Sequence, residues 1–199
     1  MIIKEKALPY PPETTPPLLC PELKPVVLAH ENPWFKVRSR GSFYTLEYDQ
    51  PQVAILPVLN GNSVLMLRVK RPLIDDCPLD IPGGGALPGE TPVRAAMREF
   101  AEETGIEIKD PSRFVPELPI SEMPGRMPVL LSVFRVDLDA AEFEARRPHD
   151  SEIVSIEAVP FPELTRRILD GEIYLGPIIA IIARLLLRTF AAGHAADKC

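Results

Sequence analysis

The sequence has 199 residues, which suits one domain of ordinary size with a terminal arm. An apolar share of 46% permits a sizeable core, and a net charge of −6 argues against a protein whose main partner is a nucleic-acid backbone. The cysteines Cys20, Cys77 and Cys199 have no CxxC spacing, so free thiols in a reducing compartment are expected. The longest apolar stretch, Leu175–Leu187, is too short to span a bilayer, and the N-terminus does not resemble a signal peptide. A cytoplasmic protein with no membrane partner is predicted.

The first 50 residues are predicted to form an arm followed by short strands. Many of the 24 prolines crowd the stretch Pro9–Pro25, which suits neither a helix interior nor a central strand. This stretch is expected either to be an extended arm that wraps the domain or a partner subunit, or to be disordered. Short strands are predicted next, at Pro25–His30, Trp34–Arg40 and Phe43–Tyr48.

Residues 51–199 are predicted to form a second unit that mixes strands and helices. The tripeptide Asn60-Gly61-Asn62 is a strong hairpin signal because Asn and Gly tolerate positive φ. The remaining elements follow in chain order: strands at Gln52–Leu59, Ser63–Lys70, Leu79–Ile81, Val129–Leu138 and Ile153–Val159, and helices at Pro162–Leu169 and Pro177–Phe190. This mixture predicts an α/β (α+β) fold in which a mixed sheet packs between helices.

The clearest predicted helix lies between Thr91 and Gly105. Thr91 can cap its start, Pro92 suits the first helical position, and Gly105 suits the left-handed conformation that ends many helices. The glycines before this helix, Gly83–Gly85, would let the backbone come close to a ligand or a metal ion.

Three glutamates share one face of that helix. Glu99, Glu102 and Glu103 stand at positions i, i+3 and i+4, so their like charges would repel one another unless a cation neutralised them. Carboxylate oxygens are the ligands that Mg²⁺ prefers, with water and substrate phosphate completing its shell. Arg98 precedes this face and can pair with Glu102. The alternative is an ordinary surface helix rich in glutamate.

The segment GGALPGETPVRAAMREFAEETGI, from Gly84 to Ile106, resembles the Nudix box G-x5-E-x7-R-E-U-x-E-E-x-G-U, in which U is apolar. Every specified position matches, although Phe100 is larger than the usual aliphatic residue. The resemblance implies a Nudix-type α/β/α sandwich and metal-assisted hydrolysis of a nucleoside diphosphate derivative, with Mg²⁺ or Mn²⁺ as the cofactor. It also implies roles for box residues: Glu99 and Glu103 as principal metal ligands, Glu102 as a further ligand, Glu90 and Arg98 as their supports, and a backbone carbonyl near Gly84 or Gly85 as another ligand.

A looser similarity, from about Val26 to Leu187, points to the ADP-ribose (ADP-sugar) pyrophosphatase branch of that family. It rests on the segments ENPWFKVR, VAILPVL, LRVKRPLIDDCPLDIPGGG and GEIYLGPIIAIIARLL. The branch implies a nucleotide-sugar substrate, best represented by ADP-ribose, which is cleaved to AMP and ribose 5-phosphate. It also implies a homodimer that the N-terminal strand region helps to build, with substrate sites shared between subunits.

Three residues outside the box are expected to bind substrate. Trp34 is either a platform for adenine or a side chain packed in a strand interface. Arg71 is expected to hold a phosphate, because the guanidinium group suits phosphate geometry, although it could also be a surface charge at a strand end. Asp80 stands where the branch usually has Glu, and this departure leaves its role open.

The catalytic base is expected to be a carboxylate on a loop before a late strand, as in that branch. Glu152, in HDSEIVSIEAVP, is the first choice and Asp150 the second. Glu122, in SEMPGRMP, is a third candidate on a loop that could lie over a pocket. The alternative is that these are loop acids without a catalytic role.

Two other functions are weighed against the ADP-sugar prediction. One is a Nudix hydrolase of a different nucleotide: a nucleoside triphosphate, a dinucleoside polyphosphate, NADH or coenzyme A. The segment RVKRPLIDDCPLDIPGGG lacks the longer arginine-bearing signature of coenzyme A hydrolases, which disfavours that substrate alone. The other is a sensor that binds a nucleotide without cleaving it, which the complete set of box carboxylates disfavours.

Overall fold

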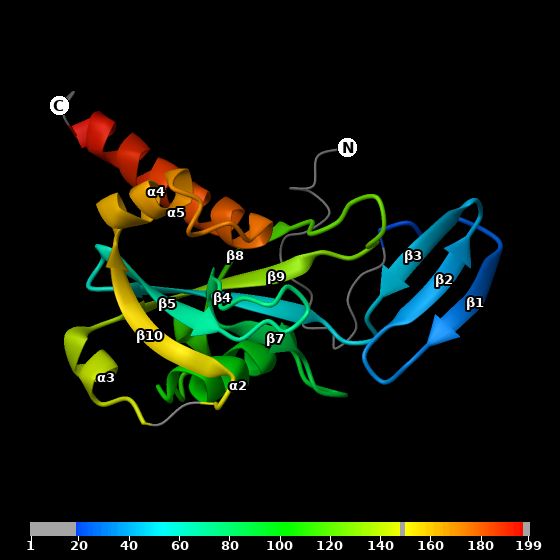
Figure 1. Cartoon of the computed structure of the whole chain (residues 1–199), viewed down its shortest axis with the longest axis horizontal. Helices are drawn as coiled ribbons and strands as arrows, with labels where there is room; N and C mark the ends of the chain where they lie inside the picture. The colour runs from blue at the N-terminus through cyan, green and yellow to red at the C-terminus, as the bar shows by residue number, and fades with distance from the viewer. Residues whose placement is uncertain (1–18, 148–149, 197–199) are drawn as a thin grey trace.

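The computed structural model describes residues 19–147 and 150–196 of the chain (Figure 1). A small antiparallel sheet comes first, made of β1 (Val26–Glu31), β2 (Lys36–Arg40) and β3 (Phe43–Glu47). It lies beside the rest of the molecule, and β4 begins the larger unit at Gln52. The predicted boundary at residue 50 falls between these two sheets. Most of the predicted arm, residues 1–18, lies outside the described residues.

The larger unit is built on a seven-stranded mixed sheet. Its order is β10-β5-β4-β9-β8, with β6 paired to β5 and β7 paired to β4. Strands β4 and β9 are parallel, and all other pairs are antiparallel. The strand bounds are β4 Gln52–Leu59, β5 Ser63–Val69, β6 Leu79–Asp80, β7 Gly83–Gly85, β8 Val115–Ile120, β9 Leu131–Leu138 and β10 Ile153–Pro160.

Helices cover both faces of this sheet. Helices α2 (Pro92–Thr104) and α3 (Ala140–Glu144) lie on one side, and α4 (Phe161–Leu169) and α5 (Gly176–Ala196) lie on the other (Figure 1). The predicted α/β/α sandwich with a mixed sheet is therefore confirmed. In the part of the chain that the structure describes, no helix is both long enough and apolar enough to cross a membrane.

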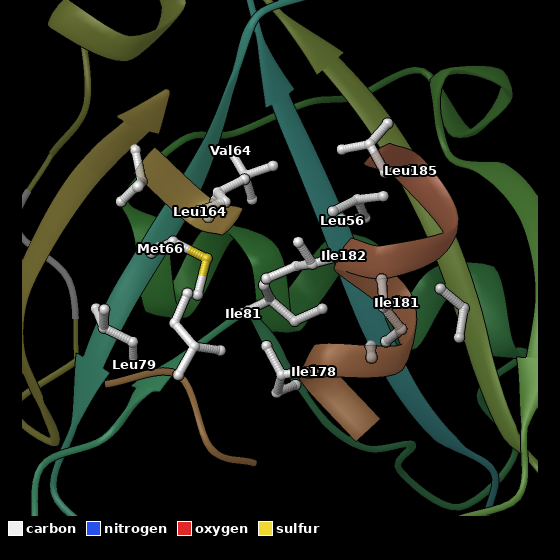
Figure 2. Close-up of a cluster of buried hydrophobic side chains, with 14 of the residues drawn as sticks. Leu56, Val64, Met66, Leu79, Ile81, Leu164, Ile178, Ile181, Ile182 and Leu185 are labelled. Carbon is white, nitrogen blue, oxygen red and sulfur yellow. The ribbon is translucent and has the colours of Figure 1, made fainter. Parts of the chain in front are cut away.

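The central strand β4 supplies side chains to a hydrophobic core on each face. Leu56 and Val58 point to the α4–α5 side, where they meet Ile178, Ile182 and their neighbours (Figure 2). Val53 and Ile55 join the second core, under α2. Because both faces of the sheet are buried, β4 and β5 are apolar almost throughout rather than alternating. This packing fixes the ends of the central strands, where the site is found.

Several local predictions are confirmed and others are corrected. Asn60 and Gly61 have φ of 50° and 69°, as the hairpin signal predicts, and Gly105 ends α2 with φ of 71°. Thr91 precedes α2 but makes no capping hydrogen bond through its side chain, contrary to expectation. Strand β8 was not predicted, because Pro116 and Pro119 cannot donate to a ladder. Its place at the sheet edge, paired with β9 alone, tolerates them.

The other differences concern element bounds. The strand expected from Val129 begins at Leu131, α5 continues beyond Phe190 to Ala196, and the short helices α3 and Pro111–Arg113 were not predicted. Asp139 explains α3, since its side chain and that of Glu142 form a reciprocal capping box.

Candidate active site

Two carboxylates of α2 lie directly against the glycine strand β7. Glu103 Oε2 accepts a hydrogen bond of 2.8 Å from the backbone N–H of Gly83. A Cβ built on Gly84 would lie only 2.6 Å from the Glu99 carboxyl carbon, so a side chain there would have to displace that carboxylate. The glycine at this position thus leaves room for the Glu99 carboxylate, and the predicted approach of the backbone to a ligand or metal ion stays a prediction.

The charges of these carboxylates are poorly compensated by the protein. The pKa of Glu103 is raised to about 8, chiefly by burial and also by the charges of Glu99 and Asp80, while the Gly83 N–H and Arg71 oppose the rise. Burial also raises the pKa of Glu99, although Arg98 pulls it down. Such groups favour a bound cation, because a metal charge would repay the desolvation of the ionised form.

The donor set fits a hard divalent cation. No group of three His, Cys, Asp or Glu side chains within residues 19–147 and 150–196 comes together as a complete metal cage. Mg²⁺ is commonly held by one or two carboxylates, with water and substrate phosphate as its other ligands. Glu99 and Glu103, with the backbone beside Gly84, offer an arrangement of this kind.

Arg98 organises the carboxylates of the box. Its guanidinium group donates to Glu90, to Glu99 at 2.9 Å, to Glu102 at 3.1 Å, and to the carbonyl oxygen of Gly85 at 2.9 Å. The Glu90 carboxylate also accepts from the N–H of Leu87, which anchors the loop between β7 and α2, residues 86–91, called the glycine loop below. The predicted pairing of Arg98 with Glu102 is confirmed. The ties to Glu90 and Gly85 add a link between the loop and the helix.

A cavity of about 340 Å³ opens beside the glycine strand, at the sheet edge where β5 and β8 end and where β4 and β9 begin. Its polar wall includes Arg71, Asp80 and Glu122, and α5 contributes Leu175 and Ile178 to its apolar wall. Arg71 donates to Asp80 at 2.7 Å, and Asp80 also accepts from the N–H of Ile81 at 2.9 Å. The structure thus brings Arg71 and Asp80 together, with Asp80 holding the guanidinium group.

Trp34 lies in a different hollow from Arg71. Its side chain is 76% exposed and lines a groove of about 490 Å³, together with Leu87 and Pro88 of the glycine loop. The groove and the cavity share Tyr48 and Gln52 in their walls. Trp34 is therefore not packed in a strand interface within this chain, and a ligand could extend from one hollow to the other.

The three proposed bases occupy different positions. Glu152 is exposed, and its carbonyl oxygen accepts from the N–H of Lys70 at 3.0 Å. Asp150 donates its N–H to the carbonyl of Glu102 at 3.0 Å, so this loop meets the C-terminal end of α2. Neither Glu152 nor Asp150 lines the cavity, whereas Glu122 does.

Tyr48 and Gln52 were missed as site residues. No motif marks them, since Tyr48 directly follows β3 and Gln52 begins β4, and both reach the site only through the order of strands. The stretch around Leu175 and Pro177 was predicted as the start of an apolar helix but not as part of the site, and it forms the cavity wall because α5 begins there.

Comparisons with known proteins agree with this geometry. The NUDIX domain model matches residues 49–179, and the chain therefore belongs to the NUDIX family. A relative from Bacillus subtilis (strain 168), an ADP-ribose pyrophosphatase, is 25% identical over 122 residues, which cover 61% of this chain and 64% of that protein. The chain thus matches somewhat less than two thirds of that relative's length.

A solved structure, described as the crystal structure of ADP compounds hydrolase, has the same fold. Its TM-score is 0.61 at 17% identity, over 90% of this chain and 96% of that one. The predicted family and fold class are confirmed, and the predicted enzyme class, a pyrophosphohydrolase, agrees with them.

Proposed function

We propose that the protein is a divalent-metal-dependent pyrophosphohydrolase of nucleoside diphosphate sugars, with ADP-ribose as the preferred substrate. The observation that carries this proposal is the pair of desolvated carboxylates, Glu99 and Glu103, seated on the glycine strand beside a cavity that contains Arg71. The Bacillus subtilis relative named above supports the choice of substrate.

In this proposal Glu99 and Glu103 hold Mg²⁺, which Mn²⁺ could replace, with Glu102 and the Gly84 carbonyl as further ligands. The bound ion supplies charge neutralisation for the diphosphate oxygens. Arg98 donates to both Glu99 and Glu102, which offsets their repulsion and holds them in place, and for this reason it belongs to the catalytic machinery.

The remaining groups bind and activate the reactants. Arg71, held by Asp80, binds diphosphate oxygens, and Trp34 stacks on the adenine in the adjoining groove. Glu152 accepts a proton from the attacking water. Asp150 and Glu122 are the alternative acceptors. The water oxygen bonds to one phosphorus and the bridging P–O bond breaks, which leaves AMP and ribose 5-phosphate.

A homodimer is part of the proposal. The small sheet exposes apolar and aromatic side chains: Val27 (57%) and Tyr44 (61%), which share one face through Ser39, and Leu28 (51%) on the other face. A second copy of the chain would bury some of these side chains. Sedimentation or light scattering of the purified protein tests this point, and a monomer at micromolar concentration would reject it.

The substrate is tested by product release from a panel of nucleotides with Mg²⁺: ADP-ribose, ADP-glucose, GDP-mannose, NADH, diadenosine polyphosphates, coenzyme A and dGTP. The highest kcat/KM is expected for ADP-ribose, with AMP and ribose 5-phosphate as products. Preference for another member would assign a different Nudix substrate. Tight binding without turnover by the folded protein would instead make it a sensor.

A further inference from the structure

Glu122, the acidic side chain on the far wall of the cavity, is so far only an alternative proton acceptor in the proposed reaction. Glu122 follows β8, and Arg71 follows β5. Both strands run antiparallel to the β4–β9 pair, so both end at the same sheet edge. Three strand spacings separate β5 from β8 in the order β5-β4-β9-β8, a distance of about 14 Å. On one side of the cavity lies Arg71, paired with Asp80, and on the opposite, acidic side lies Glu122.

The oxygens of the Glu122 carboxylate can accept hydrogen bonds that no group of the described protein residues supplies. Among the described residues it has no hydrogen-bond donor or ion-pair partner. The residue as a whole is exposed, yet partial burial of the carboxyl group raises its pKa. Tyr48 lines the same cavity, and burial, followed by the charge of Glu122, raises the pKa of the Tyr48 hydroxyl. Because Glu122 lines the cavity without a donor from the part of the chain that the structure describes, its carboxylate can exchange water for the hydrogen-bond donors of a bound ligand.

The chemistry of a nucleotide sugar determines which of its groups can donate hydrogen bonds to Glu122. Phosphate oxygens would be repelled by Glu122 and belong on the Arg71 side, beside the glycine strand. The group attached beyond the diphosphate is the part of the ligand that can reach the acidic side, and in a nucleotide sugar it carries hydroxyls. Two neighbouring hydroxyls match the two oxygens of one carboxylate, as an acidic residue matches a ribose in dinucleotide-binding sites.

We infer that Glu122 is a specificity-determining residue that accepts hydrogen bonds from the vicinal 2- and 3-hydroxyls of the sugar beyond the diphosphate. This inference rests on the proposed function, because it takes that sugar to be part of the substrate. It sets Glu122 apart from the groups that activate water, and it makes the cavity selective against a sugar that lacks these hydroxyls or carries a further phosphate on them.

The test compares ADP-ribose with its analogue that is 2-deoxy in the terminal sugar, using wild type, Glu122→Gln and Glu122→Ala. Hydrogen bonds to a charged group contribute about 1.5–3 kcal/mol, so wild type should favour ADP-ribose on the order of tenfold or more in kcat/KM. In both variants kcat/KM for ADP-ribose should fall, mainly through a higher KM, while kcat/KM for the deoxy analogue should change little. The preference for ADP-ribose over the analogue should therefore nearly vanish. Glu144→Gln, an exposed glutamate on α3, is the matched control and should keep the preference.

Binding without turnover gives an independent measurement. Calorimetry with ribose 5-phosphate and 2-deoxyribose 5-phosphate should show the same preference in wild type and its loss in Glu122→Gln. An equal fall in kcat for both nucleotides, with no change in product binding, would overturn the inference and make Glu122 the base. An unchanged preference in an active variant would overturn it as well. Failure of wild type to cleave ADP-ribose would instead defeat the proposed function.

Discussion

The carboxyl group of Glu99 occupies the space where a side chain at Gly84 would begin. A Cβ on Gly84 would lie 2.6 Å from the Glu99 carboxyl carbon and from one of its oxygens. The glycine strand and the box helix are thus joined by contact between a backbone and a carboxylate. This contact explains why the position carries glycine although its φ is not positive.

Gly84→Ala should therefore damage catalysis more than folding. The added methyl group meets the far end of a flexible side chain, so Glu99 can swing away and the melting temperature should change little. The displaced carboxylate can no longer hold its metal position, and kcat should fall on the order of a hundredfold, as when a well-placed catalytic group is moved. The matched control is Gly125→Ala, where an added Cβ meets nothing within 4 Å. Equal activity of the two variants would refute this role of Gly84.

A second prediction concerns the acid stability of the small sheet. Burial alone would raise the pKa of Glu47, but hydrogen bonds from Arg40 and Thr45 outweigh it and lower the pKa to about 2. Because the folded pKa lies below the ordinary value of 4.5, this carboxylate stabilises the folded state above about pH 4.5, and the stabilisation is lost as the pH falls toward 2.

Glu47→Gln should then lower the free energy of unfolding at pH 7 by more than about 1 kcal/mol. At pH 2.5 the difference from wild type should be much smaller, as measured by urea denaturation. Glu31→Gln removes an exposed pairing with Lys36 and is expected to have little effect at either pH. A Glu47→Gln penalty that did not change with pH would show that its charge is not the source of stability.

A third prediction separates binding from folding at the groove. Trp34 is 76% exposed, so Trp34→Ala should leave the melting temperature nearly unchanged. Loss of a stacking surface for the base should raise KM for ADP-ribose about tenfold and leave kcat within about twofold, in line with about 1–3 kcal/mol per stacked base. Phe43→Ala, an aromatic residue of β3 that is 52% exposed and does not line the groove, serves as the control. If both variants raised KM alike, the effect would come from the sheet and not from Trp34.

The sequence predicts best what depends on neighbours along the chain. The carboxylate face of α2 follows from helical spacing, and so does the pairing of Arg98 with Glu102. The contact of Glu103 with Gly83 spans twenty residues and needed the packing of helix on strand. Tyr48 and Glu122 share a cavity only because β8 is the edge strand of the sheet beside β9. The two prolines of β8 make this strand hard to predict from the sequence pattern.

The position of the proposed base was the weakest prediction for the same reason. The loop that carries Asp150 and Glu152 is placed by backbone hydrogen bonds to Glu102 and Lys70, and no local pattern encodes them. Burial is equally hidden from sequence, so the raised pKa of Glu103 could not be expected from its place on a surface helix.

The most direct measurement is the rate of AMP release from ADP-ribose as Mg²⁺ is titrated, for wild type and Glu103→Gln. Wild type should be inactive in chelator and saturate with Mg²⁺. Glu103→Gln should keep its fold, because an amide oxygen can still accept from Gly83, and should lose on the order of a thousandfold in kcat. Glu107→Gln, an exposed glutamate just beyond α2, should behave as wild type. Full Mg²⁺-dependent activity in Glu103→Gln would contradict the metal site described here.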